Sequence, residues 1–185
     1  MKRLKTEATE TAQDTSRSFE FERLFLEHWA SVYRILRRLV GDPAEAEDLA
    51  LEAFLRLYRH NQKRPEVENA GGWLYQAATR LGLNSIRDWK RREGYELSAG
   101  RYALEETAQL SPADILVQEE ERRQVRLALA RMNERQSQLL ILRYSGLSYK
   151  EIANALDLAP ASIGPLLVRA EQEFEKQYRA LAQEE

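Results

Sequence analysis

The chain has 185 residues, 43% of them hydrophobic and 31% charged, so it can bury one medium core or two small ones and is not disordered throughout. It contains no cysteine and only two histidines, which leaves a zinc site without ligands and a histidine-based triad without a partnered base. It has no glycine-rich phosphate loop and no Gly-x-Ser-x-Gly turn, so enzyme activity is disfavoured and no cofactor is expected.

Residues 1–18 are charged and rich in Ser and Thr, and we expect a flexible tail rather than a signal peptide or membrane span. This composition, together with the absence of cysteine, fits a cytoplasmic protein without membrane insertion. The net charge of −2 gives no overall basic signal for nucleic acid. However, basic residues gather over residues 87–92 and acidic ones over 42–52 and 105–121, which implies two kinds of partner.

The first helix is predicted over residues 19–40, where apolar residues recur at spacings of three and four. A second helix is predicted over residues 43–60 because its start carries strong signals. Asp42 can cap it, Pro43 suits the first helical position, and Glu45 can reach back to the cap.

One stripe of this second helix combines two carboxylates with two leucines that its core face does not need. The stripe consists of Asp48, Leu51, Glu52 and Leu55. A solvated face seldom carries leucines in this way, so one hypothesis is a docking surface for a basic partner. The alternative is an edge partly buried against the N-terminal tail.

Residues 61–72 have the polar, Pro- and Gly-containing composition of a loop, and a helix is predicted over 73–92. One side of that helix is apolar, and the other shows cations and amides, with Leu83 among them. The candidate nucleic-acid contacts are Trp73, Gln76, Arg80, Asn84, Arg87, Lys90 and Arg91, with Trp89 as a second flat ring. Cations for phosphates and flat rings for bases are what melted nucleic acid requires. The alternative is a solvated basic helix end with tryptophans in the core.

Residues 93–111 lose helical periodicity and contain Gly94 and Gly100, which predicts a linker between a domain over 19–92 and a second over 112–185. Ser111 is expected to cap the helix that follows, which continues to about residue 132. The expected fold class is therefore all-α, with two helical domains joined by a linker.

The second domain carries two further capping signals, Asn133 with Gln136 and Ser148 with Glu151. A short apolar stripe then ends at residues 157–159, and a longer one begins at Ile163. A short helix, a turn and a longer helix predict a helix-turn-helix, which can lay its second helix in a DNA major groove. The same hairpin also occurs as plain core structure.

These residues together resemble the extracytoplasmic-function group of the sigma-70 family of bacterial transcription factors. The resemblance covers about residues 19–180. Its N-terminal motifs are Ala46-Glu47-Asp48-Leu49 with Glu52, Ala53 and Phe54, then Trp73-Leu74-Tyr75 and Ile86-Arg87. Its C-terminal motifs are Asn133-Glu134-Arg135-Gln136, Leu142-Arg143-Tyr144, the run from Gly146 to Ala153, and Arg169-Ala170.

The resemblance implies a specificity subunit that binds core RNA polymerase and directs promoter recognition, DNA melting and transcription initiation. It implies that Asp48, Leu51 and Glu52 dock on the clamp helices of the β′ subunit. It also implies that the helix over 73–92 opens and binds the −10 element, and that the helix-turn-helix domain binds the −35 element and the β flap. The acidic linker would thread through polymerase channels. Control by an anti-sigma factor is expected, and a small-molecule substrate is not.

The chain departs from the family at its DNA-binding positions. Arg80 and Asn84 stand where the family often has Asn and Asp, so promoter preference does not transfer. Gly164-Pro165-Leu166 replaces the usual basic and serine residues of the recognition helix, and Asp157 replaces a common turn glycine. The −35 contact is therefore expected to be weak or apolar. Its candidates are Arg143, Tyr149, Lys150, Ser162 and Arg169.

Two other functions stay open at this stage. A conventional helix-turn-helix repressor or activator would bind duplex DNA tightly without polymerase. A helical adaptor or anti-sigma partner would have lost its DNA contact, and the Gly164-Pro165-Leu166 segment supports that hypothesis.

Overall fold

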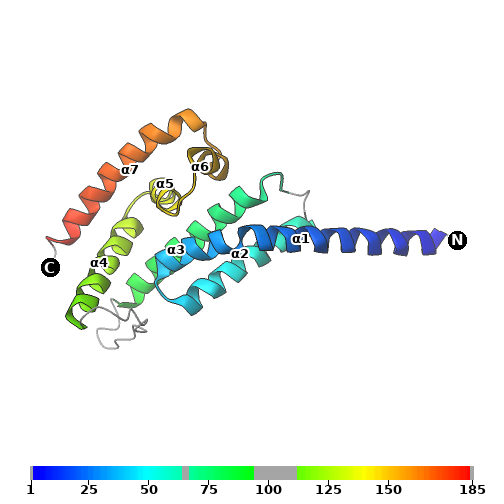
Figure 1. The fold of residues 1–185 in the computed structure, drawn as a ribbon, viewed down its shortest axis with the longest axis horizontal. Helices are drawn as coiled ribbons and strands as arrows, with labels where there is room; N and C mark the ends of the chain where they lie inside the picture. The colour runs from blue at the N-terminus through cyan, green and yellow to red at the C-terminus, as the bar shows by residue number, and fades with distance from the viewer. Residues whose placement is uncertain (1, 64–66, 94–111, 184–185) are drawn as a thin grey trace.

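A computed structural model describes residues 2–63, 67–93 and 112–183. This part of the chain folds into seven helices and contains no strand, which confirms the all-α prediction (Figure 1). The helices are α1 (Lys2–Val40), α2 (Pro43–Lys63), α3 (Ala70–Glu93), α4 (Pro112–Arg131), α5 (Glu134–Tyr144), α6 (Tyr149–Leu156) and α7 (Pro160–Leu181). We call α1–α3 the N-terminal lobe and α4–α7 the C-terminal lobe.

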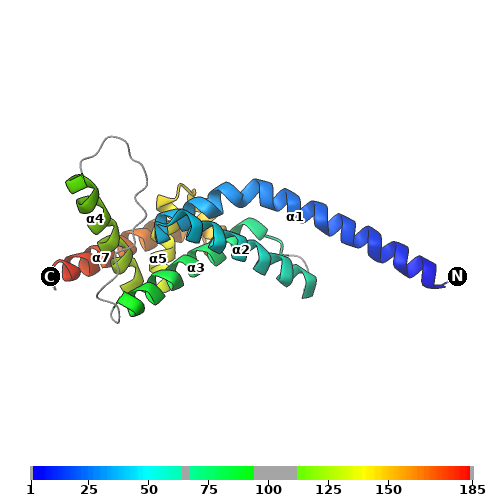
Figure 2. The same cartoon turned by 90° about the horizontal axis from the view of Figure 1, so that it is seen from below.

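Helix α1 begins at Lys2, so residues 2–18 continue a helix where the sequence composition suggested a flexible tail. This stretch contains neither glycine nor proline, the two residue types that most often interrupt a helix. Figures 1 and 2 both show this end of α1 projecting beyond the other helices.

The N-terminal lobe packs its three helices around an apolar core. Ile35 and Leu36 of α1 and Leu57 of α2 are fully buried in it. Gly82 lets α3 approach α1 closely, because a Cβ atom there would lie 2.5 Å from a methyl carbon of Leu39. A substitution of Gly82 would therefore push the two helices apart.

The start of α2 follows the sequence prediction, because Asp42 Oδ1 accepts a hydrogen bond of 2.9 Å from the Glu45 backbone. The Glu45 side chain does not reach back to the cap, and instead accepts a hydrogen bond from the Ser85 hydroxyl on α3. This contact ties the two helices together.

Helix α3 begins at Ala70, three residues before the predicted start, and the loop before it is shorter than expected. The reason is Asn69, whose Oδ1 accepts a 2.9 Å hydrogen bond from the Gly72 backbone and so caps the helix. The two glycines that suggested a loop are thus within the first turn of a capped helix.

The C-terminal lobe contains the predicted helix-turn-helix in α6 and α7. Asn133 caps α5 through a 2.9 Å hydrogen bond from the Arg135 backbone. Ser148 and Glu151 form a complete capping box at the start of α6. Asp157 closes α6 in the left-handed conformation, with φ of 52°, at the position where glycine is common. The predicted cap Ser111 lies outside the described residues.

The two lobes lie against each other, with α3 between them (Figures 1 and 2). Helix α3 contacts α1 and α2 on one side and α4, α5 and α6 on the other. Buried residues of both lobes form one continuous apolar cluster. Glu93, the first residue of the linker expected over 93–111, ends α3, and residues 94–111 lie outside the described residues.

Candidate protein and nucleic-acid interfaces

The acidic and apolar stripe on α2 faces solvent. Leu51 and Leu55 are 41% and 45% exposed, and Asp48 beside them is exposed as well. Glu52 accepts a 2.7 Å hydrogen bond from Arg56 Nε, four residues further along the same helix. The structure therefore presents two leucines flanked by carboxylates, and not an edge buried within the described chain.

The cationic side of α3 lies against the C-terminal lobe. Arg80 Nε donates a 2.8 Å hydrogen bond to Glu134 of α5, and Arg87 Nε donates one of 3.4 Å to the carbonyl of Ala130 at the end of α4. Leu83, which lies between these arginines on the same stripe, is fully buried. Both arginine contacts thus reach across the lobe boundary.

The remaining candidates on α3 differ in exposure. Asn84 and Lys90 are exposed and Gln76 is half-buried. The side chain of Arg91 lies outside the described part of the chain. Only some of the predicted nucleic-acid contacts are therefore open to solvent.

Neither tryptophan of α3 is fully exposed. The ring of Trp73 is half-buried, with the His60 ring at 5.8 Å. Trp89 packs against the small apolar cluster of the C-terminal lobe, and the Arg123 guanidinium lies 5.9 Å from its ring centre. Trp89 therefore belongs to the contact between lobes.

The helix-turn-helix exposes few cations. Lys150 and Arg169 are exposed, Ser162 is half-buried, and the Arg143 guanidinium lies 5.4 Å from the ring centre of Tyr149. The other exposed residues in the first half of α7 are Pro160, Ala161, Pro165 and Val168. The surface of α7 that would enter a groove is therefore largely apolar.

Pro165 lies inside α7 and not in its first turn. Pro160 is the residue that takes the first helical position. Pro165 therefore leaves one backbone carbonyl of the helix without its usual donor.

Among the described residues, two ionisable groups have shifted pKa values. Burial raises the pKa of Tyr75, whose hydroxyl oxygen lies 3.0 Å from His28 Nδ1 of α1. Hydrogen bonds from the Ser148 hydroxyl and backbone lower the pKa of Glu151 in the capping box. Both shifts belong to groups that hold helices in place.

Two further contacts that join the lobes were not predicted from the sequence. Asn69 Nδ2 donates a 3.1 Å hydrogen bond to the carbonyl of Asn154 in α6, and Arg38 donates to the carbonyl of Tyr144 at the end of α5. The capping role of Asn69 could have been found from its place before a helix. The contacts across the lobes carry no local signal, because the partners are far apart in the sequence.

Within the described ranges, no group of three or more His, Asp or Glu side chains is arranged to hold a metal ion. In the same residues, no helix is both long and apolar enough to cross a membrane.

Each lobe matches a known protein family. Residues 24–93 match the family model described as Sigma-70 region 2, and residues 122–174 match Sigma-70, region 4. The chain is 28% identical over 159 residues to the ECF RNA polymerase sigma factor SigW of Bacillus subtilis, covering 81% of this chain and 84% of that protein. The chain belongs to the extracytoplasmic-function (ECF) group of the sigma-70 family.

Two other relatives support the assignment of this chain to the sigma-70 family. The RNA polymerase sigma-H factor of Pseudomonas aeruginosa is 27% identical, with 89% of each chain covered. The ECF RNA polymerase sigma factor BldN of Streptomyces coelicolor is 30% identical over 81% of this chain and 57% of its own length. The region 2 match contains the α2 stripe and all of α3, and the region 4 match contains α5, α6 and most of α7.

Proposed function

We propose that this ECF sigma factor docks on core RNA polymerase through α2, presents α3 to the −10 element, and holds its helix-turn-helix near the −35 element. In this role it directs promoter melting and transcription initiation in the cytoplasm and catalyses no reaction itself. The observation that carries the proposal is the α2 stripe, in which exposed leucines stand between carboxylates inside the region 2 match.

The chemistry of the α2 stripe favours a basic partner with apolar side chains, as the family's clamp-helix contact requires. Full burial of a wholly exposed leucine contributes about 1.5–3 kcal/mol. Leu51 and Leu55 are 41% and 45% exposed, so burial of their remaining surface can add about 1 kcal/mol each. Asp48 and Glu52 add charge complementarity, which speeds association and rejects acidic partners. Arg56 holds Glu52 within the free protein, and a cation of the partner would compete with it.

Helix α3 combines the groups that a melted DNA strand needs. Arg80, Arg87 and Lys90 offer cations for phosphates, and Gln76 and Asn84 offer amides for base edges. Extruding a base costs a few kcal/mol, and stacking on an aromatic ring returns about 1–3 kcal/mol per base. Trp73, half-buried at the start of α3, is the ring proposed for that stacking.

The C-terminal lobe is proposed to bind DNA weakly. Arg143, Tyr149 and Lys150 lie at or before the start of α6, Ser162 and Arg169 lie on α7, and no other cation lies in the first turns of α7. Few cations mean few phosphate contacts and little affinity for duplex DNA alone. This surface argues against a conventional helix-turn-helix repressor, because such a protein has to bind duplex DNA without help from polymerase.

Two partners besides promoter DNA follow from membership of the ECF group. The β′ clamp helices and the β flap of polymerase are proposed to hold the two lobes. An anti-sigma factor is proposed to cover the polymerase-binding surface until a signal releases it.

The test is transcription in vitro with purified protein, core RNA polymerase and fragments of genomic promoter DNA. New transcript starts that depend on the protein are the expected result, and their aligned upstream sequences define both promoter elements. A protein that does not bind core polymerase at all would contradict the proposal. Binding without any transcript start would restrict it to the docking step.

A further inference from the structure

One exposed side of α7 is apolar over its first turns. Ala161, Pro165 and Val168 are spaced by four and three residues, so they stand on the same side of the helix, and we call them the α7 stripe. All three are exposed, with Val168 at 53%. Ile163 and Leu167, on the opposite side of the helix, are buried. The α7 stripe therefore points away from the core and into solvent.

Cations stand on both sides of the α7 stripe. Arg169 is exposed beside Val168 on one side. On the other side, Tyr149 of α6 lies next to the stripe, because a Cβ atom at Gly164 would lie 3.8 Å from its ring carbon Cε2. The Arg143 guanidinium stands over that ring. A helix in a major groove has base edges in front of it and a phosphate backbone on either side, so this order of groups matches the groove.

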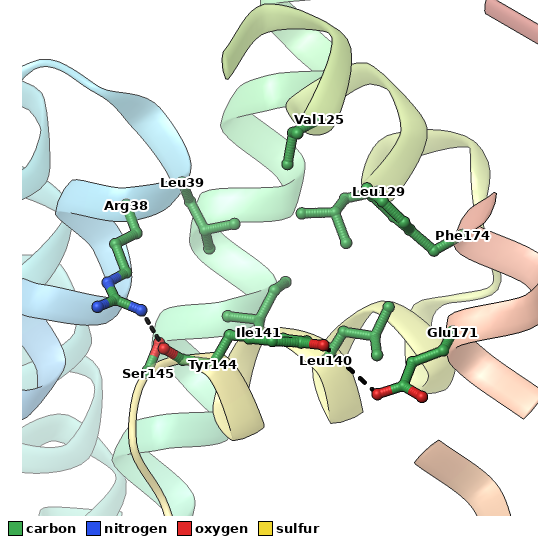
Figure 3. A pocket seen from close by; sticks show the side chains of 10 residues that line it. All are labelled: Arg38, Leu39, Val125, Leu129, Leu140, Ile141, Tyr144, Ser145, Glu171 and Phe174. Atoms are coloured by element: carbon green, nitrogen blue, oxygen red, sulfur yellow. Dashed lines mark hydrogen bonds between the residues drawn. The ribbon is translucent and has the colours of Figure 1, made fainter. Parts of the chain in front are cut away.

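Carboxylates confine this surface to the start of α7. Glu171 and Glu175 are exposed further along the helix, and Glu175 follows Val168 by two turns on the same side. The Tyr144 hydroxyl at the end of α5 donates a 3.4 Å hydrogen bond to Glu171 (Figure 3). Because carboxylates repel phosphates, contact with DNA is limited to the first turns of α7. Those turns are the part of a recognition helix that meets base edges.

The side chains of the α7 stripe have no group that can form a hydrogen bond with a base. In the major groove, guanine, cytosine and adenine present hydrogen-bond donors and acceptors, whereas thymine also presents one apolar group, its 5-methyl. Apolar side chains can pack on that methyl group and exclude water from it. A G·C pair at the same place sets only polar groups against the stripe, and these lose water without gaining a partner. The stripe therefore favours A·T pairs.

We propose that α7 selects the −35 element by packing Ala161, Pro165 and Val168 on thymine methyl groups. The inference rests on the proposed contact of the helix-turn-helix with the −35 element, and it names how that contact discriminates between sequences. Arg143 and Arg169 bind the phosphates on the two sides of the groove, and hydrogen bonds to base edges are not required. Docking on core polymerase supplies the remaining affinity, so a weak contact of this kind suffices to select a sequence.

The thymine methyl can be removed alone, because deoxyuridine pairs as thymidine does and lacks only that group. The assay measures binding of the protein with core polymerase to a promoter found by transcript mapping, with each −35 thymine of either strand replaced in turn. We expect about three- to fourfold weaker binding for each contacted methyl, the factor that burial of one methyl-sized group contributes. Deoxyuridine in the spacer between the two elements is the control and should change nothing. Full binding with every −35 thymine replaced would overturn the proposal, as would a −35 element of G·C pairs alone.

The assignment to the α7 stripe is tested by Val168→Ala, which removes two methyl groups and favours the helix. Val117→Ala on α4 is the matched control, because Val117 is 59% exposed and lies outside the region 4 match. We expect one −35 position at which deoxyuridine weakens binding about three- to fourfold in the unmutated protein and less than about twofold in Val168→Ala. Val117→Ala should keep the full effect at every position. Equal sensitivity of the two variants at every position would overturn the assignment of methyl contacts to α7.

A measurement on the free protein separates failure of this inference from failure of the proposed function. If the protein starts no transcription with core polymerase, the proposed function fails. The free protein is then mixed, at low salt to strengthen its few phosphate contacts, with two duplexes of one A·T-rich sequence, one made with thymidine and one with deoxyuridine on both strands. Tighter binding of the thymidine duplex that is lost in Val168→Ala supports methyl contact by α7. Equal binding of both duplexes by the unmutated protein overturns it.

Discussion

The N-terminal and C-terminal lobes differ in the side chains that they expose for binding and in how clearly the sequence marks their helices. The N-terminal lobe carries leucines with carboxylates on α2 and cations with amides on α3, the groups that we propose bind polymerase and melted DNA. The C-terminal lobe has a complete capping box at α6, yet its α7 exposes Ala161, Pro165 and Val168 where cations would be useful. A well-formed helix-turn-helix is therefore not in itself a strong DNA-binding surface.

The largest effect should come from the α2 stripe of the N-terminal lobe. Asp48→Arg with Glu52→Arg places two cations against a basic partner, and we expect affinity for core polymerase to fall about a hundredfold or more. Binding of labelled protein to core polymerase measures it. The control is Glu22→Arg on α1, an exposed carboxylate outside the stripe, which should change little. Unchanged binding in the double variant would show that α2 is not the docking surface.

The next effect concerns the stability of the C-terminal lobe. Pro165→Ala restores a backbone donor inside α7, and we expect the free energy of unfolding to rise by about 2 kcal/mol in urea titrations. Pro160→Ala is the matched control, because a backbone N–H added at the first helical position finds no carbonyl within the helix to bond. Equal effects of the two substitutions would mean that α7 has already relaxed around Pro165. If Pro165→Ala stabilises the chain but leaves DNA binding unchanged, the stability of α7 and its affinity for DNA are independent. The weak DNA binding proposed for this lobe is then due to its surface residues and not to the proline.

A third experiment compares cations of the two lobes. Arg87→Ala with Lys90→Ala, assayed in complex with core polymerase, should weaken binding of a single-stranded oligonucleotide about tenfold. Each lost phosphate contact lowers the slope of log affinity against log salt by about 0.7, so the double variant should lower it by about 1.4. Arg169→Ala in α7 serves as the control and should leave this slope unchanged. A larger loss from Arg169 than from α3 would reverse the assignment of single-strand binding to the N-terminal lobe.

Local signals in the sequence predicted most of the fold. Helical periodicity and the caps at Asp42, Asn133 and Ser148 located α2, α5 and α6, because a cap involves only neighbours along the chain. The start of α3 was placed late, since two glycines outweighed the capping signal of Asn69. The helix over residues 2–18 was missed because its composition is polar.

The contact between the lobes could not be predicted in the same way. Arg80 and Glu134 are 54 residues apart, and neither residue type suggests a partner so distant. The one local hint was Leu83, an apolar residue among the cations and amides of α3. Its complete burial is explained by the C-terminal lobe, which packs on that side of the helix.

The smallest effect concerns the cap of α6. Ser148→Ala removes the hydroxyl that bonds Glu151 and the backbone, and we expect the free energy of unfolding to fall by about 1 kcal/mol near neutral pH. The Ser148 hydrogen bonds lower the pKa of Glu151 in the folded chain, so this carboxylate stabilises the fold above its ordinary pKa of about 4.3. That contribution is lost as the pH falls through the lowered value, because both the folded and the unfolded chain are then protonated.

Urea titrations from pH 7 down to about pH 3 would follow the difference between the unmutated protein and Ser148→Ala, which should shrink toward the acid end. Glu151→Gln is the control, since it keeps an acceptor without a titrating charge and should reduce the pH dependence of that difference. A difference that is the same at every pH would assign the stabilisation to the hydroxyl alone. Binding of core polymerase at neutral pH should change little in either variant, because both variants leave the α2 stripe intact and weaken only the cap of α6.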